Sequence, residues 1–310
     1  MEEMPSLKDV EDAAKRLKGK VMRTPILSSR LLNERLGVQV FLKCENLQFA
    51  GAFKFRGASN VISQLTPEER SRGVVTHSSG NHAQALALAA KRAGIKAVIV
   101  MPEGSNPYKR AATEAHGATV LTCENSQAAR EAMCREEMDR EGLLLVHPYD
   151  DARIISGAGT AALEFLQERP DLDAIVTPVG GGGLLSGTAT AAEGRCPVYG
   201  SEPEGADDAH RGFTSGERVS SQTPHTISDG LRTCLGVLNF QVIRARVAGI
   251  GLVTDDETLE AMRWVKFHTG QAIEPSSAVP IAALRNGSLP VSGKVGVILS
   301  GGNVDPALFE

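Results

Sequence analysis

Short runs rich in β-branched residues alternate with alanine-rich helical stretches along most of the 310-residue chain. Between residues 73 and 148 strands and helices follow one another in turn, and similar units recur around 173–204 and 255–300. Parallel strands require a crossover long enough to hold a helix, so this order predicts an α/β protein with parallel, doubly wound sheets. The pattern is irregular from about 205 to 240, and within this stretch we expect the segment TSGERVSSQTPHT to be a polar loop.

The strands and helices between about residues 72 and 150 could form a three-layer unit of their own, with a sheet between helices. We therefore predict two domains, a large one made of residues 1–70 and 151–310 and a small mobile one made of residues 71–150. No internal repeat and no low-complexity linker interrupts this organisation.

Charge and cysteine content narrow the classes of function. The net charge is -4 and no basic run occurs, which argues against a nucleic-acid partner. No apolar run approaches the length of a membrane span, and the start of the chain carries no apolar signal region. The five cysteines are scattered without a CxxC pair, as in proteins with reduced thiols. We expect a cytoplasmic protein with no membrane partner.

The segment GAFKFRG, which we expect to be a glycine-bounded loop after a strand, places Lys54 between Phe53 and Phe55. An ammonium group beside apolar neighbours loses solvation, which lowers its pKa and makes the amine nucleophilic. A lysine that forms a Schiff base needs this property. The competing interpretation is a surface lysine whose stem lies over aromatic rings.

The segment VGGGGLLSG contains four consecutive glycines, Gly180–Gly183, between an expected strand and an expected helix. Backbone N–H groups in such a loop can converge on a phosphate. A flexible turn is the simpler explanation, although a turn needs only one or two glycines. A sharper rival is a dinucleotide fingerprint, because Gly181, Gly183 and Gly187 form a loose GxGxxxG with Glu202 about 20 residues on. That rival predicts a nicotinamide-dependent oxidoreductase.

Three further motifs carry polar groups at expected element ends. SSGNHAQA sets Asn81 where a strand meets a helix, and its first residues also suit an ordinary helix cap. SEPEGADD supplies Glu202 and Asp208 as hard oxygen ligands for a divalent cation, or else forms a solvated acidic turn. LSGGN sets Ser300 at the carboxyl end of a strand, where ligands bind in open α/β sheets.

Together these five motifs, in this order, resemble the fold-type II pyridoxal-phosphate enzymes, in the branch of serine racemases, serine/threonine dehydratases and 3-hydroxyaspartate dehydratases. The resemblance runs from about residue 5 to the end of the chain. It implies a tryptophan synthase β-like α/β fold with two domains, each built on a mainly parallel, helix-flanked sheet. It also implies a homodimer and a large domain that binds pyridoxal 5'-phosphate.

The resemblance assigns roles to the matching positions. The cofactor positions are Phe53, Lys54, Asn81, Gly180, Gly181, Gly182, Gly183 and Ser300, with Lys54 as the covalent attachment point. The substrate positions are Ser78, Ser79, Asn81, His82 and Arg130. The positions for Mg²⁺, or for Ca²⁺ or Mn²⁺, are Glu202, Asp208 and the carbonyl of Ala206.

Ser79 bears on which reaction is catalysed. Many threonine dehydratases that resemble this chain have alanine there, whereas serine racemases and 3-hydroxyaspartate dehydratases have serine. A hydroxyl opposite Lys54 would return a proton to the second face of the substrate. The competing interpretation is a helix-capping hydroxyl. Ala83 and Tyr149 depart from the animal racemases, which favours a dehydratase.

The sequence thus predicts a lyase that converts small β-hydroxy amino acids of the L-serine or L-threonine type to a 2-oxo acid and ammonia, with Lys54 and Ser79 catalytic and serine racemisation as a side activity. The alternatives are an L-threo-3-hydroxyaspartate dehydratase that yields oxaloacetate, a dedicated serine racemase and the nicotinamide-dependent oxidoreductase.

Overall fold

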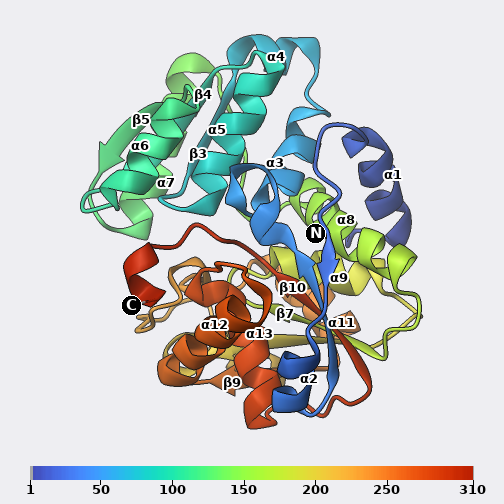
Figure 1. Cartoon of the computed structure of the whole chain (residues 1–310). Coiled ribbons are helices and arrows are strands. Elements are labelled where there is room, and N and C mark those ends of the chain that lie inside the picture. The colour runs from blue at the N-terminus through green and yellow to red at the C-terminus, as the bar shows by residue number, and fades with distance from the viewer. Residues whose placement is uncertain (1–2, 310) are drawn as a thin grey trace.

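The computed structural model describes residues 3–309 and contains two helix-flanked sheets, the smaller at the top of Figure 1. The larger sheet has the strand order β1-β2-β10-β7-β8-β9, and the smaller has the order β5-β4-β3-β6. Within residues 3–309, β1 is antiparallel to β2 and every other strand pair is parallel. The predicted α/β class with mainly parallel sheets is confirmed.

The strands are short and lie mostly in the interior. They are β1 (Ile26–Leu27), β2 (Gln39–Cys44), β3 (Val74–His77), β4 (Ala97–Pro102), β5 (Thr119–Cys123), β6 (Leu144–Leu145), β7 (Ala174–Pro178), β8 (Val198–Pro203), β9 (Gly249–Val253) and β10 (Lys294–Leu299). The α-helices are α1 (Leu7–Leu17), α2 (Arg30–Leu36), α3 (Lys54–Ile62), α4 (Pro67–Arg72), α5 (Asn81–Ala93), α6 (Pro107–Ala115), α7 (Gln127–Glu141), α8 (Ala152–Glu168), α9 (Gly183–Ala191), α10 (Asp208–Ser215), α11 (Val237–Arg246), α12 (Asp255–Thr269) and α13 (Pro275–Asn286).

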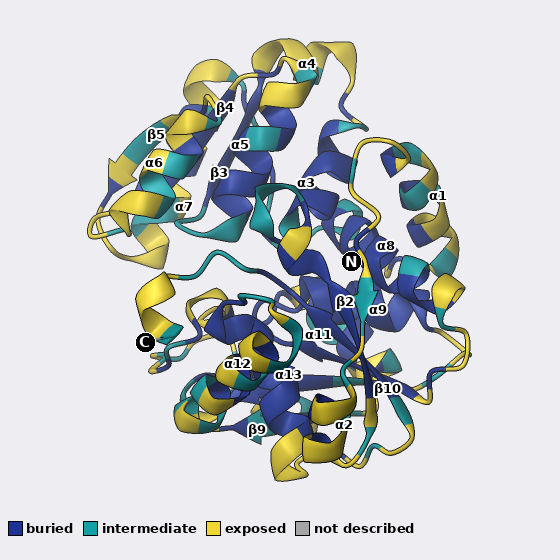
Figure 2. Cartoon of the chain, in the orientation of Figure 1, coloured by how far each residue is buried: buried dark blue, intermediate teal, exposed yellow. Residues whose placement is uncertain are grey.

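The six-stranded sheet is covered on both faces, because successive side chains of a strand point to opposite sides. In β10, Val297 and Leu299 pack in a cluster with residues of α2, α12 and α13. Ile298 packs on the other face with residues of α1, α8, α9 and α11. Figure 2 shows the resulting buried interior and the exposed outer faces of the surrounding helices. A strand buried on both faces explains the apolar run KVGVIL.

The smaller sheet has its own two packing faces. Val74 and Ile99 lie in one cluster with residues of α3 and α5, whereas Val75 and Val98 lie in another with Cys134 of α7. The limits of the two predicted domains, and the mobility of the small one, stay predictions. Residues 1, 2 and 310 of the predicted large domain lie outside the described residues.

The polar loop expected at TSGERVSSQTPHT is confirmed from Gly216 onward, where the chain forms neither helix nor strand. The irregular stretch before it contains α10, a helix that the sequence pattern did not predict and whose first-turn amides donate to the carboxylate of Glu202. Lys54 was expected in a loop, but it is the first residue of α3. The five cysteines are free thiols, as expected. Within residues 3–309 no helix combines the length and the apolar character needed to cross a membrane.

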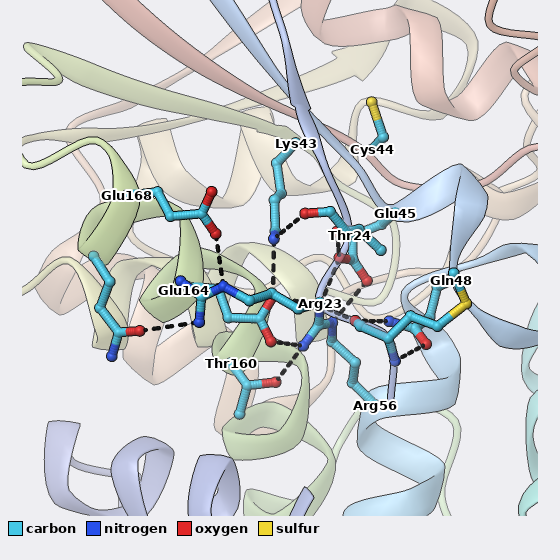
Figure 3. A network of polar contacts seen from close by, with 12 residues as sticks. Arg23, Thr24, Lys43, Cys44, Glu45, Gln48, Arg56, Thr160, Glu164 and Glu168 are labelled. Atoms are coloured by element: carbon cyan, nitrogen blue, oxygen red, sulfur yellow. Dashed lines mark hydrogen bonds and ion pairs between the residues drawn. The ribbon is translucent and has the colours of Figure 1, made fainter. Parts of the chain in front are cut away.

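A buried charge network fixes the start of α3 (Figure 3). Arg56 is fully buried and donates to both carboxylate oxygens of Glu45, at 2.7 and 2.8 Å, and to both of Glu164, at 2.8 and 2.9 Å. Lys43 donates to Glu164 (2.8 Å) and to the carbonyl of Thr24 (2.7 Å). Removing one member would leave a buried charge without a partner, which is strongly destabilising. The network therefore holds the start of α3, and with it Lys54, in a fixed position.

Candidate active site

Lys54 lies between the two sheets. Its Nζ donates to the carbonyl of Pro148 (2.8 Å) and lies 5.2 Å from the centre of the Phe53 ring and 5.9 Å from that of Tyr149. Burial lowers the pKa of the Lys54 amine from 10.5 to about 8, and the negative charge of Glu274 opposes that shift. The amine is therefore far easier to deprotonate than a surface lysine, as a Schiff-base lysine requires.

The glycine loop has the form of an anion cradle. Gly180–Gly183 are buried between β7 and α9, and among the hydrogen bonds of residues 3–309 none is donated by their N–H groups. A Cβ on Gly180 would lie 2.8 Å from the Gly230 oxygen, and one on Gly182 would lie 2.8 Å from Cβ of Asn239. Buried unpaired N–H groups at a helix start are costly unless an anion accepts from them. The residues present therefore fit the phosphate of pyridoxal phosphate.

The Tyr149 ring lies close to both Lys54 and the glycine loop. Its ring atoms lie 2.3–2.4 Å from where a Cβ on Gly181 would be, so only glycine allows the close approach. His147 packs edge-on against Tyr149, with ring centres 4.7 Å apart, and its Nδ1 accepts from the amides of Tyr149 (3.3 Å) and Asp150 (2.8 Å). Burial lowers the pKa of His147, which agrees with a neutral accepting ring.

Asn81 is the first residue of α5, and its side chain contacts residues next to α13 and after β10. Its Nδ2 donates to both carboxylate oxygens of Glu274, at 2.8 and 3.0 Å, and its Oδ1 accepts from Asn303 Nδ2 (2.9 Å). Burial and the nearby charge of Asp229 raise the pKa of Glu274 to about 7, although the Asn81 hydrogen bond opposes them. The structure thus places the predicted cofactor residue Asn81 within a fixed polar network beside Lys54.

Ser300 lies just after β10, next to the residue that precedes Lys54. Its carbonyl accepts from the amide of Phe53 (3.0 Å), and its hydroxyl lies 3.2 Å from the hydroxyl of Ser277. Ser277 also accepts from the amide of Gly301 (2.9 Å). The Ser300 hydroxyl is therefore oriented by a neutral partner, which suits a neutral hydrogen bond to a ring nitrogen.

The loop before α5 presents one free hydroxyl. The Ser78 hydroxyl accepts from the amide of Gly80 (3.3 Å), whereas Ser79 is half-buried and takes part in no hydrogen bond among those of residues 3–309. The N-cap of α5 is Gly80 and no side chain caps this helix, so the capping interpretation of Ser79 was wrong. His82 is buried, and desolvation holds its pKa well below the usual value.

Glu202 and Asp208 form a buried acidic pair behind the glycine loop. Burial raises the pKa of both, to about 6 for Asp208 and well above the usual range for Glu202, where the charge of Asp208 adds to the effect. Asp208 accepts from the amide of Leu235 (2.8 Å), and the next residue, Gly236, donates to the carbonyl of Gly181 (3.2 Å). Within residues 3–309 no group of three or more His, Cys, Asp or Glu side chains is arranged to hold a metal.

Arg130 lies in the first turns of α7. Its Nε donates to the carbonyl of Ser126 (3.2 Å), and it takes part in no ion pair among residues 3–309. Burial lowers the pKa of His77 to about 4, with the charges of His147 and Arg130 adding to the shift. Arg130 is thus close enough to His77 to act electrostatically on the wall of the site that His77 and His147 form, with ring centres 6.1 Å apart.

Sequence reasoning gave no role to Glu274, Ser277 or Asn303, although they hold Asn81 and Ser300 in place. The available clue was the segment EPSSAVP, where a glutamate and two serines begin an otherwise apolar helix. Glu274 and Asn303 lie 193 and 222 positions after Asn81, so only the folded chain shows that they meet it.

Comparisons with known proteins agree with this geometry. The family model described as "Pyridoxal-phosphate dependent enzyme" matches residues 17–301. A serine racemase of Dictyostelium discoideum is 44% identical, with 97% of this chain and 95% of that protein covered. An L-threo-3-hydroxyaspartate ammonia-lyase of Saccharomyces cerevisiae is 45% identical, with 97% and 94% covered. The solved structure of maize serine racemase has a TM-score of 0.96 at 38% identity, with 98% and 95% covered.

Proposed function

The chain belongs to the family of pyridoxal-phosphate dependent enzymes, and from that premise we propose that it removes water and then ammonia from small β-hydroxy amino acids. The observation that carries the proposal is the Lys54 amine, with its pKa of about 8, beside a glycine loop whose buried N–H groups are unpaired. The family match leaves the nicotinamide-dependent alternative without support.

The residues divide the chemistry among themselves. When bound, pyridoxal phosphate supplies an electron sink for the charge left at Cα of the substrate. Lys54 would hold the cofactor covalently, and its free amine would take the Cα proton. Gly180–Gly183 would hold the phosphate through their N–H groups, and Asn81 and Ser300 would offer hydrogen bonds to the ring. Ser300 offers a neutral hydrogen bond, which limits the stabilisation of the charge at Cα and favours rapid loss of the β-hydroxyl.

L-Serine and L-threonine are the proposed substrates, and 3-hydroxyaspartate is the second candidate. The second candidate is supported by the similarity to an L-threo-3-hydroxyaspartate ammonia-lyase and by the cation of Arg130 near the wall of the site. The deciding assay supplies the purified holoenzyme with serine, threonine and 3-hydroxyaspartate in each configuration. Formation of the 2-oxo acid with ammonia supports the lyase, and interconversion of enantiomers without 2-oxo acid would make it a dedicated racemase.

Arg130→Ala tests the second candidate. A β-carboxylate would pair with the guanidinium, and a charge-assisted hydrogen bond of about 1.5–3 kcal/mol corresponds to a loss of about tenfold or more. We expect kcat/KM for 3-hydroxyaspartate to fall by that factor while kcat/KM for serine changes little.

Arg135→Ala is the matched control, because Arg135 is exposed on the same helix. An equal loss for serine and 3-hydroxyaspartate in Arg130→Ala would instead assign Arg130 to closure of the small domain.

We also propose a divalent cation, Mg²⁺ or else Ca²⁺ or Mn²⁺, held by Glu202, Asp208 and the carbonyl of Ala206. The proposal is supported by two adjacent buried carboxylates whose pKa values are raised and which form no ion pair among residues 3–309. A cation would relieve their repulsion and brace the glycine loop through Leu235 and Gly236.

Chelation should therefore lower the midpoint of thermal unfolding of the holoenzyme by a few degrees, and added Mg²⁺ should restore it. Asp208→Asn should lose this response, whereas Glu204→Gln, an exposed neighbour, should keep it. If the chelator changes neither the midpoint nor the activity, the acidic pair binds no cation.

The remaining features of the proposal concern assembly and motion. Lys109 of α6, in the segment that forms the smaller sheet, makes an ion pair with Asp229, in the segment that forms the larger sheet. This contact supports closure of residues 71–150 over the substrate. The homodimer rests on the family resemblance, and the cytoplasmic location rests on the charge and cysteine content of the chain.

A further inference from the structure

A cavity that includes none of the glycine-loop residues lies among α3, α4, α5 and the segment that follows α1. Its volume is about 410 Å³, and its lining includes Phe55 and Ile62 on α3 and Ala89 on α5. Phe55 is buried beneath it and packs edge-on against Phe49, with ring centres 5.4 Å apart. The floor of this cavity is therefore apolar and partly aromatic.

Three cations surround the cavity, and no acidic residue lines it. Lys20 Nζ donates to the Ser63 hydroxyl (3.1 Å), Arg70 to the carbonyl of Ala93 (2.9 Å), and Arg92 to the carbonyl of Lys20 (3.2 Å). Among residues 3–309 none of the three forms an ion pair, and Arg92 also lies over the Phe49 ring, 3.9 Å from its centre.

Helix ends account for part of this positive charge but not for all of it. The carboxyl ends of α1, α3 and α5 are near the cavity, and each carries about half a negative charge. Three such ends offset about half of the three side-chain charges. The excess is one to two positive charges, which fits an anion of similar charge.

A hydroxyl inside the cavity has no partner. Ser59 lines the cavity, is 6% exposed, and its hydroxyl takes part in no hydrogen bond among those of residues 3–309. The hydroxyl is not among the buried side-chain atoms that lack a partner, so it is open to the cavity and available to a ligand. Ser59 thus adds a hydrogen-bonding group to the apolar floor.

We propose that this cavity binds a small organic monoanion or dianion, a phosphate or carboxylate that carries an apolar group. The anionic end contacts Lys20, Arg70 and Arg92, and the apolar end rests on Phe55. Such a ligand joins α3, which begins at Lys54, to α5, which begins at Asn81. Binding therefore restrains the two helices that carry cofactor residues.

The test is titration calorimetry of the holoenzyme with phenyl phosphate at low ionic strength, with the cofactor absorbance followed to show that the glycine loop stays filled. We expect saturable binding that weakens with salt, and no binding of benzyl alcohol, the neutral probe. Arg70→Gln should weaken binding about tenfold and Ser59→Ala by a smaller factor.

Arg72→Gln is the matched control, because Arg72 is exposed on the same helix and does not line the cavity. No saturable heat with the wild type, or equal affinities in Arg70→Gln and Arg72→Gln, overturns the proposal.

Discussion

Replacing Lys54 with alanine is expected to lower turnover of every β-hydroxy amino acid by about 10⁴-fold. The amine both attaches the cofactor and moves the Cα proton, and general acid–base catalysis alone contributes about 10²–10⁴-fold. The side chain ends in a single hydrogen bond to Pro148, so its loss leaves the buried network around Arg56 intact. The variant should therefore fold, and its unfolding midpoint should stay close to that of the wild type.

Chemical trapping of the cofactor distinguishes loss of catalysis from loss of cofactor binding. Borohydride should fix the cofactor to Lys54 of the wild type, as peptide mapping would show, and Lys18→Ala, an exposed-lysine control, should behave in the same way. The Lys54→Ala variant should bind pyridoxal phosphate without a covalent bond. Retention of a tenth of the activity, or a label on another lysine, would contradict the assignment.

The lowered pKa of Lys54 has a consequence for cofactor uptake by the apoenzyme. Only the unprotonated amine attacks an aldehyde, and burial lowers its pKa from 10.5 to about 8. The attachment rate should therefore rise with pH through about 8 and then level, whereas an ordinary lysine would require a pH above 10.

The fold was predictable where a local pattern determines an element. The strands Val74–His77, Ala97–Pro102 and Thr119–Cys123 follow directly from apolar runs separated by alanine-rich helices. Helix Asp208–Ser215 was missed because its first-turn amides are satisfied by the carboxylate of Glu202, which lies outside the helix, and a polar local sequence does not reveal that contact. The start of α3 was also missed, because the partners of Arg56 lie as far away as Glu164.

The site was predictable as a set of motifs but not as a network. Lys54 and the glycine loop stand out by composition alone, since few structures require a lysine between aromatic rings or four glycines in a row. Glu274 does not, because a glutamate at a helix start is also common as a cap. Its importance depends on burial and on Asn81, which lies 193 residues away in sequence.

Replacing Ser79 with alanine should remove racemisation while elimination continues. Lys54 is anchored at the start of α3 and reaches one face of the substrate, so formation of the other enantiomer needs a second proton donor. We expect Ser79 to be that donor, because its hydroxyl lies on the loop before α5 and is engaged in no hydrogen bond within residues 3–309. Loss of a general acid corresponds to about 10²–10⁴-fold, so enantiomer formation should fall below detection.

Ser78→Ala is the matched control for this experiment. The Ser78 hydroxyl already accepts from the amide of Gly80, so its removal should disturb the loop and lower both activities together. The measured quantity is the ratio of racemisation to 2-oxo acid formation from L-serine, because a ratio is insensitive to a partial loss of folded enzyme. Ser79→Ala should lower that ratio at least 100-fold, and Ser78→Ala should leave it nearly unchanged. An equal loss of both reactions in Ser79→Ala would make Ser79 a positioning residue, and a wild type that forms no D-serine would be a plain dehydratase.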